Sequence, residues 1–364
     1  MKRRYRSRYM KKSKYYYDVR DDLAKGCWLN FIVGGRNTGK TYSTLRMCKE
    51  DKKAFAFTKR TNDDVKILCE GAGVGDMSIS FSPFNSLNRD FGWNVQPKQI
   101  SKGIGGFWDQ GEDGPEGFPI GYILSLNALR NIKGFEFPRM LNPLIFDEFI
   151  PQPWEKVNRN EGKQVMDLYK TLDRDRIHRG EDPLQLIMLA NAVRLSNPIF
   201  NFFEVTDEFA DMQAKGEELR ILEDRGILLH LLKNSEEFDE KEHSSIVYRA
   251  MYDTDWGAMA YGNNFAYDDI STVGKRSMKG FRPVVSVQYK KRTFYIYMKE
   301  GFYYMTTSRN DQAKIYNLNR ENEQKAFFKE WLFELREACI YDKMIFETYT
   351  MYDLIINYKK IFQI

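Results

Sequence analysis

The chain has 364 residues, 42% of them hydrophobic, which is enough for two or three domains with their own cores, and no apolar run approaches the length of a membrane span, so we expect a soluble protein rather than a membrane protein. Its four cysteines are scattered and it has only three histidines, so neither a disulfide framework nor a zinc site is expected, in keeping with a reducing cytoplasm. The net charge is only +5, so any surface that binds nucleic acid must be local.

Residues 1–17 form a basic tail in which eight lysines and arginines are interleaved with five tyrosines. Basic runs of this kind attract polyanions. Two interpretations stay open: the tail contacts the phosphate backbone of DNA or RNA without reading its sequence, or it only adds solubility.

A glycine-rich loop follows a short apolar strand at residues 31–33 and precedes a helix expected to begin near Lys40. This is the phosphate-binding pattern G-x-x-x-x-G-K-[ST] (Walker A) in its expected setting. Gly34 and Gly39 are expected to adopt backbone angles closed to other residues, so that successive N–H groups face a phosphate chain. The predicted nucleotide-binding residues are Gly34, Gly35, Arg36, Asn37, Thr38, Gly39, Lys40 and Thr41.

The two residues at the end of this loop have distinct predicted roles. Lys40 would reach the β- and γ-phosphates, and the Thr41 hydroxyl would be a ligand of Mg²⁺. Arg36 is a further cation that could point at a neighbour's nucleotide. The alternative, a strand-to-helix turn with an accidental lysine, fits the flanking elements less well.

The next predicted strand, at residues 54–60, ends in Lys59 and Arg60. Because the ends of parallel strands line the ligand crevice, these cations could contact nucleotide or nucleic acid, or simply mark a solvated strand end. Residues 71–119 are rich in Gly, Ser, Asn, Asp and Pro, and we expect an insertion of short hairpins there. Residues 121–126 restore the strand pattern.

An apolar strand at residues 143–146 ends in Asp147 and Glu148, the Walker B arrangement. Behind a phosphate-binding loop, Asp147 would hold Mg²⁺ together with Thr41. Glu148 would orient and deprotonate the attacking water, which favours hydrolysis over transfer to a small acceptor. The sequence lacks the N-K-x-D motif that reads guanine, so ATP is preferred to GTP.

A helix is predicted at residues 165–177, followed by a buried strand at 184–192. Arg174 and Arg176, at the end of the helix, are candidates for an arginine finger that completes a neighbouring subunit's site, or are simply an exposed charged helix end. Asn191, at the end of the strand, could sense the γ-phosphate or position water. Five strands alternate with helices or long connections, which predicts an α/β fold: a P-loop NTPase domain of the ASCE type with a mainly parallel sheet.

The rest of the chain predicts two further parts. Residues 207–266 are charge-dense and are expected to form a small helical linker subdomain after an ATPase domain at 1–206. Residues 267–364 show strand periodicity and then helices, which predicts an α+β domain resembling an RNase H-like nuclease fold without its catalytic carboxylates. Its cations Lys290, Lys291 and Arg292 are candidates for nucleic-acid contact, with surface solubility as the alternative.

Several phrases together resemble one family, the genome-packaging motor ATPases (encapsidation proteins, terminase-like) of small tailed phages of the phi-twenty-nine type. The Walker motifs are generic. The narrower features are the phrase Phe-Asp-Glu-Phe-Ile at residues 146–150, Asn191-Ala192, Asn197-Pro198 and, more loosely, the segment from residue 261 onward.

The resemblance implies an ATP-driven translocase that works as a ring of subunits, commonly five. The ring would dock on the portal of an empty capsid in the cytoplasm of the infected host cell and drive double-stranded DNA inward. The resemblance favours Arg174 as the finger, with Lys133 acting in trans beside it, although Arg176 fits the finger pattern nearly as well. Some family members also bind a packaging RNA.

Two rival functions stay open. One is a helicase-like ring ATPase that acts on single strands. The other is a non-catalytic nucleic-acid-binding assembly protein that uses nucleotide as a switch.

Overall fold

The computed structural model describes most of the chain between residues 17 and 362. The gaps are residues 75–76, 113, 134, 136, 153, 156–157, 234–239, 241–242, 252, 255–256, 258–264, 266–270 and 310–311. Residues 1–16 of the expected basic tail lie outside the described residues. The chain divides into two compact units, Met1–Phe203 with Lys215–Tyr267, and Glu204–Ala214 with Asp268–Ile364.

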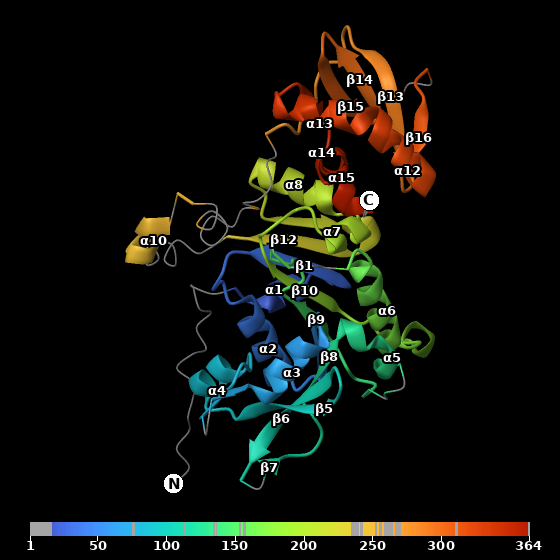
Figure 1. Ribbon diagram of the computed structural model, residues 1–364. Coiled ribbons are helices and arrows are strands. Elements are labelled where there is room, and N and C mark those ends of the chain that lie inside the picture. Colours follow the sequence, from blue (N-terminus) through green and yellow to red (C-terminus); the bar gives the residue numbers. More distant parts are fainter. Residues whose placement is uncertain are drawn as a thin grey trace. The chain divides into compact units, whose positions relative to one another are not determined.

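The first unit is built on a ten-stranded sheet in the order β11-β12-β1-β10-β9-β2-β8-β6-β5, with β7 paired to β6. Its central strands run parallel, as predicted (Figure 1). They are β1 (Leu29–Gly34), β2 (Phe55–Lys59), β8 (Gly121–Ser125), β9 (Leu144–Asp147), β10 (Leu186–Asn191) and β12 (Ile227–Leu232). The antiparallel strands are β5 (Val95–Ser101), β6 (Ile104–Gly111), β7 (Gly114–Pro115) and β11 (Leu219–Leu222).

Helices cover both faces of this sheet, which is why its central strands are apolar at consecutive positions and not only at alternate ones. On one face, Ile32 and Ile145 share a core with Leu45 of α2 and Val65 of α3. On the other face, Phe31 packs against Phe149, Phe200 and Phe203. The helices are α1 (Val19–Leu23), α2 (Lys40–Glu50), α3 (Asn62–Glu70), α4 (Asn85–Phe91), α5 (Leu129–Ile132), α6 (Glu161–Asp173), α7 (Pro198–Phe203) and α10 (Ile246–Met251).

The structure differs from two predictions about this unit. Residues 71–119 contain the short hairpin β3 (Ala72–Val74) and β4 (Met77–Ile79), but also helix α4 and the pair β5–β6, which extends the main sheet. Residues 207–266 are not a separate helical linker. Helix α8 (Thr206–Lys215) belongs mainly to the second unit, and the apolar run β12 joins the main sheet beside β1 because a buried parallel strand satisfies both its side chains and its backbone.

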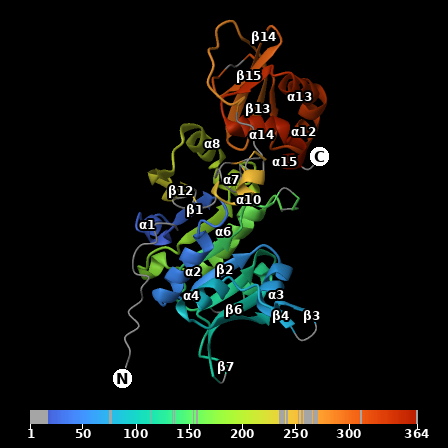
Figure 2. The ribbon, with the colours of Figure 1, turned by 90° about the vertical axis from the view of Figure 1, so that its left-hand side faces the viewer.

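The second unit carries a five-stranded sheet in the order β16-β13-β14-β15-β17 (Figure 2). Its strands are β13 (Arg282–Tyr289), β14 (Arg292–Lys299), β15 (Phe302–Thr306), β16 (Ile315–Asn317) and β17 (Met344–Phe346). The first three form the predicted antiparallel meander, and helices follow as expected. These helices are α12 (Glu321–Phe327), a π-helix (Phe328–Leu332), α13 (Phe333–Ile340), α14 (Tyr349–Ile356) and α15 (Tyr358–Phe362).

No helix in the described part of the chain has both the length and the apolar character needed to cross a membrane.

Candidate functional site

The glycine-rich loop connects β1 to α2 and folds around its own lysine. Lys40 is 8% exposed, and its ammonium donates to the carbonyl of Gly35 at 2.6 Å and to the Thr38 hydroxyl at 3.0 Å. Gly39 has φ +86° and caps the helix from the left-handed region, as predicted. The loop therefore holds a buried cation at the start of a helix, where unpaired N–H groups already favour an anion.

Gly34 needs to be glycine for a different reason from the one predicted. It is not among the positive-φ residues of the described chain. A Cβ at Gly34 would lie 2.7 Å from Cβ of Leu232, so glycine permits the close approach of β12 to β1 and not an unusual backbone angle.

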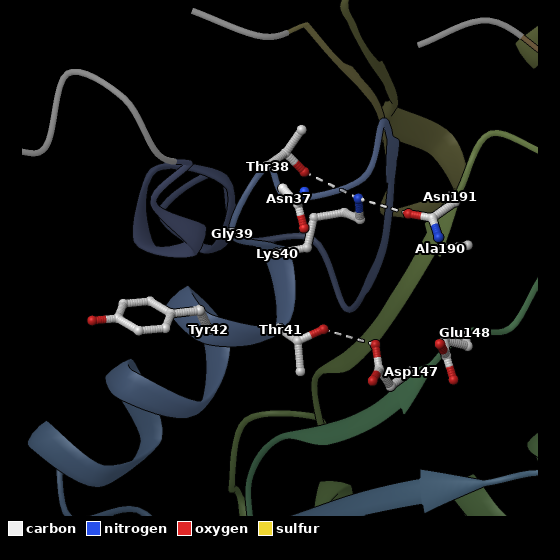
Figure 3. Close-up of a pocket in the computed structure, with 10 residues that line it drawn as sticks. All are labelled: Asn37, Thr38, Gly39, Lys40, Thr41, Tyr42, Asp147, Glu148, Ala190 and Asn191. Atoms are coloured by element: carbon white, nitrogen blue, oxygen red, sulfur yellow. Dashed lines mark hydrogen bonds between the residues drawn. The ribbon is translucent and has the colours of Figure 1, made fainter. Parts of the chain in front are cut away.

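Three parallel strands bring the chemical groups to one edge of the sheet. Gly34 of β1 lies beside Asn191 of β10, and Leu189 of β10 lies beside Asp147 of β9. The carboxyl ends of these strands therefore meet at the same edge, called here the carboxyl edge. Figure 3 shows the result: the Lys40 ammonium points towards the Asn191 amide oxygen, 3.4 Å away, and the Thr41 hydroxyl donates to Asp147 Oδ1 at 2.9 Å.

These groups line a pocket of about 240 Å³. Within the described chain its walls are Asn37, Thr38, Gly39, Lys40, Thr41, Tyr42, Asp147, Glu148, Ala190 and Asn191. Gly34, Gly35 and Arg36 are not part of its lining, and Arg36 is exposed on the outside of the loop. The hydroxyl of Thr41 and the carboxylate of Asp147 are hard oxygen donors of the kind that Mg²⁺ prefers, so this donor set fits the ion.

Lys59 takes a position that the sequence did not reveal. Because β2 lies next to β9 in the sheet, the Lys59 ammonium reaches Glu148 Oε2 at 3.0 Å and Asp147 Oδ2 at 3.4 Å. Its charge is the largest influence that lowers the pKa of Glu148, with smaller contributions from Arg60 and Arg36. Glu148 therefore stays ionised, and its side chain, 70% exposed, faces open space beside the pocket.

Arg60 secures the backbone on the other side of Glu148. Its guanidinium donates to the carbonyl of Phe149 at 3.0 Å and pairs with the buried carboxylate of Glu161, at the start of α6. Glu148 itself has φ +57°, a strained angle that these contacts help to maintain. In the structure Lys59 and Arg60 thus hold the acidic strand end, and their use as nucleic-acid contacts stays a prediction.

The candidate trans-acting residues lie far from this pocket. Helix α6 begins beside Arg60 and has 13 residues, so its far end is about 20 Å away. There Arg176 donates to the carbonyls of Arg139 and Leu141, just before β9 begins. Arg174 and Arg176 therefore lie where the parallel strands begin, called here the amino edge.

Within this group Arg174 is exposed and Arg176 is not. Arg174 donates to the carbonyl of Phe135 at 3.1 Å from the surface, close in sequence to the exposed Lys133. Arg176 is 6% exposed and is held by backbone carbonyls. A buried arginine cannot extend into another subunit, so Arg176 is unsuited to be a finger in this conformation.

In the second unit, Lys290 and Lys291 form the turn between β13 and β14. Arg292 pairs with Asp207 at 3.2 Å and lies over the ring of Phe294. These contacts give Arg292 a role within its own unit. The proposed nucleic-acid contacts of this turn stay a prediction.

Comparison with known proteins identifies relatives over most of the chain. The family model described as Podovirus DNA encapsidation protein (Gp16) matches residues 10–329. The DNA packaging protein of Bacillus phage B103 is 24% identical over 301 residues, covering 81% of this chain and 82% of that protein. The DNA packaging protein of Bacillus phage phi29 is 24% identical over 311 residues, covering 84% and 83%.

Solved structures show the same fold. A chain of the bacteriophage Phi-29 viral genome packaging motor assembly superposes with a TM-score of 0.63 at 18% identity, covering 96% of this chain and 99% of that one. A chain of the Phi-28 gp11 DNA packaging motor gives a TM-score of 0.58 at 18% identity, covering 96% and 98%. Because the family model spans most of the sequence, the chain belongs to the Podovirus DNA encapsidation protein (Gp16) family.

Proposed function

We propose that this chain is an ATP-driven translocase that packages double-stranded viral DNA into a preformed capsid through the portal. The observation that carries the proposal is the meeting of Lys40, Thr41 and Asp147 at the carboxyl edge of a parallel sheet. A buried cation and a hydroxyl–carboxylate pair at a helix start are what a triphosphate with Mg²⁺ requires. Membership of the encapsidation family supplies the nucleic-acid partner.

In this proposal the first unit is a P-loop NTPase domain of the ASCE type, and each group has one task. Lys40 moves from its loop carbonyls to the β- and γ-phosphates, and Asn191 orients the γ-phosphate or the water beside it. Thr41 and Asp147 would hold Mg²⁺, which, when bound, neutralises charge on the phosphates. Glu148, kept ionised by Lys59, accepts a proton from the attacking water.

The shared site implies a ring. Arg174 and Lys133 lie at the amino edge, so in this proposal they serve the site of a neighbouring copy and not their own. The chain would work as a homo-oligomer, proposed to be pentameric, docked on the portal in the cytoplasm of the infected host cell. A packaging RNA is a further proposed partner.

We assign the second unit to a nuclease-like shell that has been reused for binding. The middle of β13 holds Ser286, which is 0% exposed, between two buried valines, where a two-metal nuclease would place its first carboxylate. The RNase H-like assignment itself rests on the meander and the helices that follow it.

A direct test compares nucleic acids as activators. We expect double-stranded DNA to raise ATP turnover of the assembled ring more strongly than single-stranded DNA of the same length and salt, because a packaging motor tracks the duplex backbone. Turnover is measured by phosphate release. Preference for single strands would favour the helicase-like alternative, and binding of ATP without turnover would favour the structural switch.

Lys40 provides a second test, based on protons. Burial lowers the pKa of Lys40 to about 8, against the opposing charge of Asp147. Polyphosphate beside the ammonium will raise this pKa again, so ATP binding at about pH 9 should take up protons. Calorimetry in two buffers of different ionisation enthalpy measures the uptake, and the surface variant Lys53→Met should leave it unchanged. Binding at this pH without proton uptake would contradict the assigned Lys40 contact.

A further inference from the structure

A second pocket, of about 260 Å³, adjoins the phosphate pocket and shares Asp147 and Glu148 with it. Its lining contains four carboxylates but only two cations, Lys59 and Arg60. Ile67 of α3 and Phe81 add an apolar wall and are each about half exposed. The pocket is therefore acidic on one side and apolar on the other, beside the residue proposed to activate water. The proposed ATP mechanism leaves it unused.

At the amino edge the chain carries a surface of opposite character, called here the arginine turn and defined as residues 174–180. Arg174 and Asp175 have φ values of +23° and +56°, a strained backbone that surrounding contacts must maintain. Those contacts come from Arg176, whose buried guanidinium donates to the carbonyls of Arg139 and Leu141. Arg179 adds a bond from its guanidinium to the Arg174 carbonyl at 2.6 Å.

The arginine turn and the 139–141 segment present apolar and basic side chains together. Ile177 is 71% exposed and Met140 is 80% exposed. Lys133, Arg139 and Arg174 are exposed as well. Large apolar side chains at this exposure, grouped with cations on one braced surface, are typical of a contact with another protein.

The arginine turn of one chain is not positioned to fill the pocket of the same chain. Helix α6 starts beside Arg60 at the pocket and ends at the arginine turn, 13 residues later, a separation of about 20 Å. A surface that matches a pocket elsewhere on the same molecule forms a head-to-tail contact, and such contacts close into rings when the rotation permits.

We infer that the arginine turn of a second copy of this chain docks in the pocket beside Glu148, and that Arg176 is the positioning residue that holds Arg174 ready for this contact. The inference rests on the proposed function and names the partner surface of its site. Basic side chains of the turn meet the acidic lining, and Ile177 meets the apolar wall that Ile67 and Phe81 form. The order of the contact is fixed because Arg174 must arrive next to Glu148.

Cysteine cross-linking tests the docking. In a background with Cys69 and Cys339 replaced by serine, Ile177→Cys chains are mixed with Ile67→Cys chains and oxidised. We expect a cross-linked dimer that requires both variants, and no such product when Ile67→Cys is replaced by Phe118→Cys, a position that is 89% exposed. No specific product from rings that still turn over ATP would overturn the docking and leave the proposed function standing. Failure to bind or turn over ATP in the parent background would instead count against the proposed function.

Double substitution tests the role of Arg176. We expect Arg176→Ala to slow ATP turnover about as much as Arg174→Ala, with unchanged ATP affinity, because the pocket lies at the opposite edge. The double variant Arg174→Ala/Arg176→Ala should be no slower than Arg174→Ala alone, since Arg176 acts through Arg174. Arg176→Lys, which keeps the charge and a donor, should be intermediate and provides the test if the alanine variant does not fold. Additive losses, or weaker ATP binding, would make Arg176 a merely structural residue.

Discussion

Substitution of Glu148 by Gln will lower ATP turnover by about 10²- to 10⁴-fold, the range lost when a general base is removed. The amide keeps the size of the side chain and can still accept from Lys59, so the strand end should keep its shape. It cannot take a proton from water. Because Lys40, Thr41 and Asp147 are untouched, ATP affinity should change little.

Two measurements make this prediction decisive. Turnover is followed by phosphate release and ATP affinity by the fluorescence of a nucleotide analogue, both on the assembled ring. Glu70→Gln is the matched control, because Glu70 ends α3 on the surface and pairs only with Lys66 among the contacts found. Unchanged turnover in Glu148→Gln would remove Glu148 as the base and would favour the structural-switch alternative.

The sequence located the pocket well because its motifs are local. The glycine-rich loop needs only one strand, one turn and one helix, and all three lie within residues 29–50. The Asp147–Glu148 pair likewise needs only the end of one strand. That Thr41 contacts Asp147 followed from chemistry, since a metal held by a hydroxyl needs a carboxylate opposite it.

The order of strands in the sheet could not be predicted in the same way. Strand β2 lies beside β9, and β10 lies between β1 and β9, although neither pair is adjacent in the chain. The contact of Lys59 with Glu148 depends on that order, as does the position of Asn191. For the same reason the sequence suggested a separate linker where β12 completes the sheet, since an apolar run of six residues does not reveal its partner strand.

The distinction between Arg174 and Arg176 also depended on three-dimensional structure. Both follow the same helix and both are basic, so spacing alone could not separate them. Burial does: one guanidinium is enclosed by the backbone carbonyls of residues 139–141, and the other lies on the surface. That difference makes Arg174 the residue to test as the finger.

Rings of Arg174→Ala chains alone should lose about 10³- to 10⁵-fold in ATP turnover, the contribution measured for an arginine finger. Rings of Glu148→Gln chains alone should be similarly impaired. Mixed in equal amounts, the two variants should regain activity, because an intact Glu148 on one chain can meet an intact Arg174 on the next. Random mixing across head-to-tail contacts makes about a quarter of the sites complete, which sets the upper limit of the recovery.

The matched control for this mixing experiment places both changes in the same chain. Arg174→Ala mixed with the double variant Arg174→Ala/Glu148→Gln contains no intact arginine at this position, so it should recover nothing. Phosphate release is measured as a function of the mixing ratio, and a shared site gives a maximum near equal amounts. If Arg174→Ala rings were fully active alone and mixing had no effect, Arg174 would have no part in hydrolysis. The separation of about 20 Å along α6 would then divide two unrelated surfaces, instead of the two halves of one site.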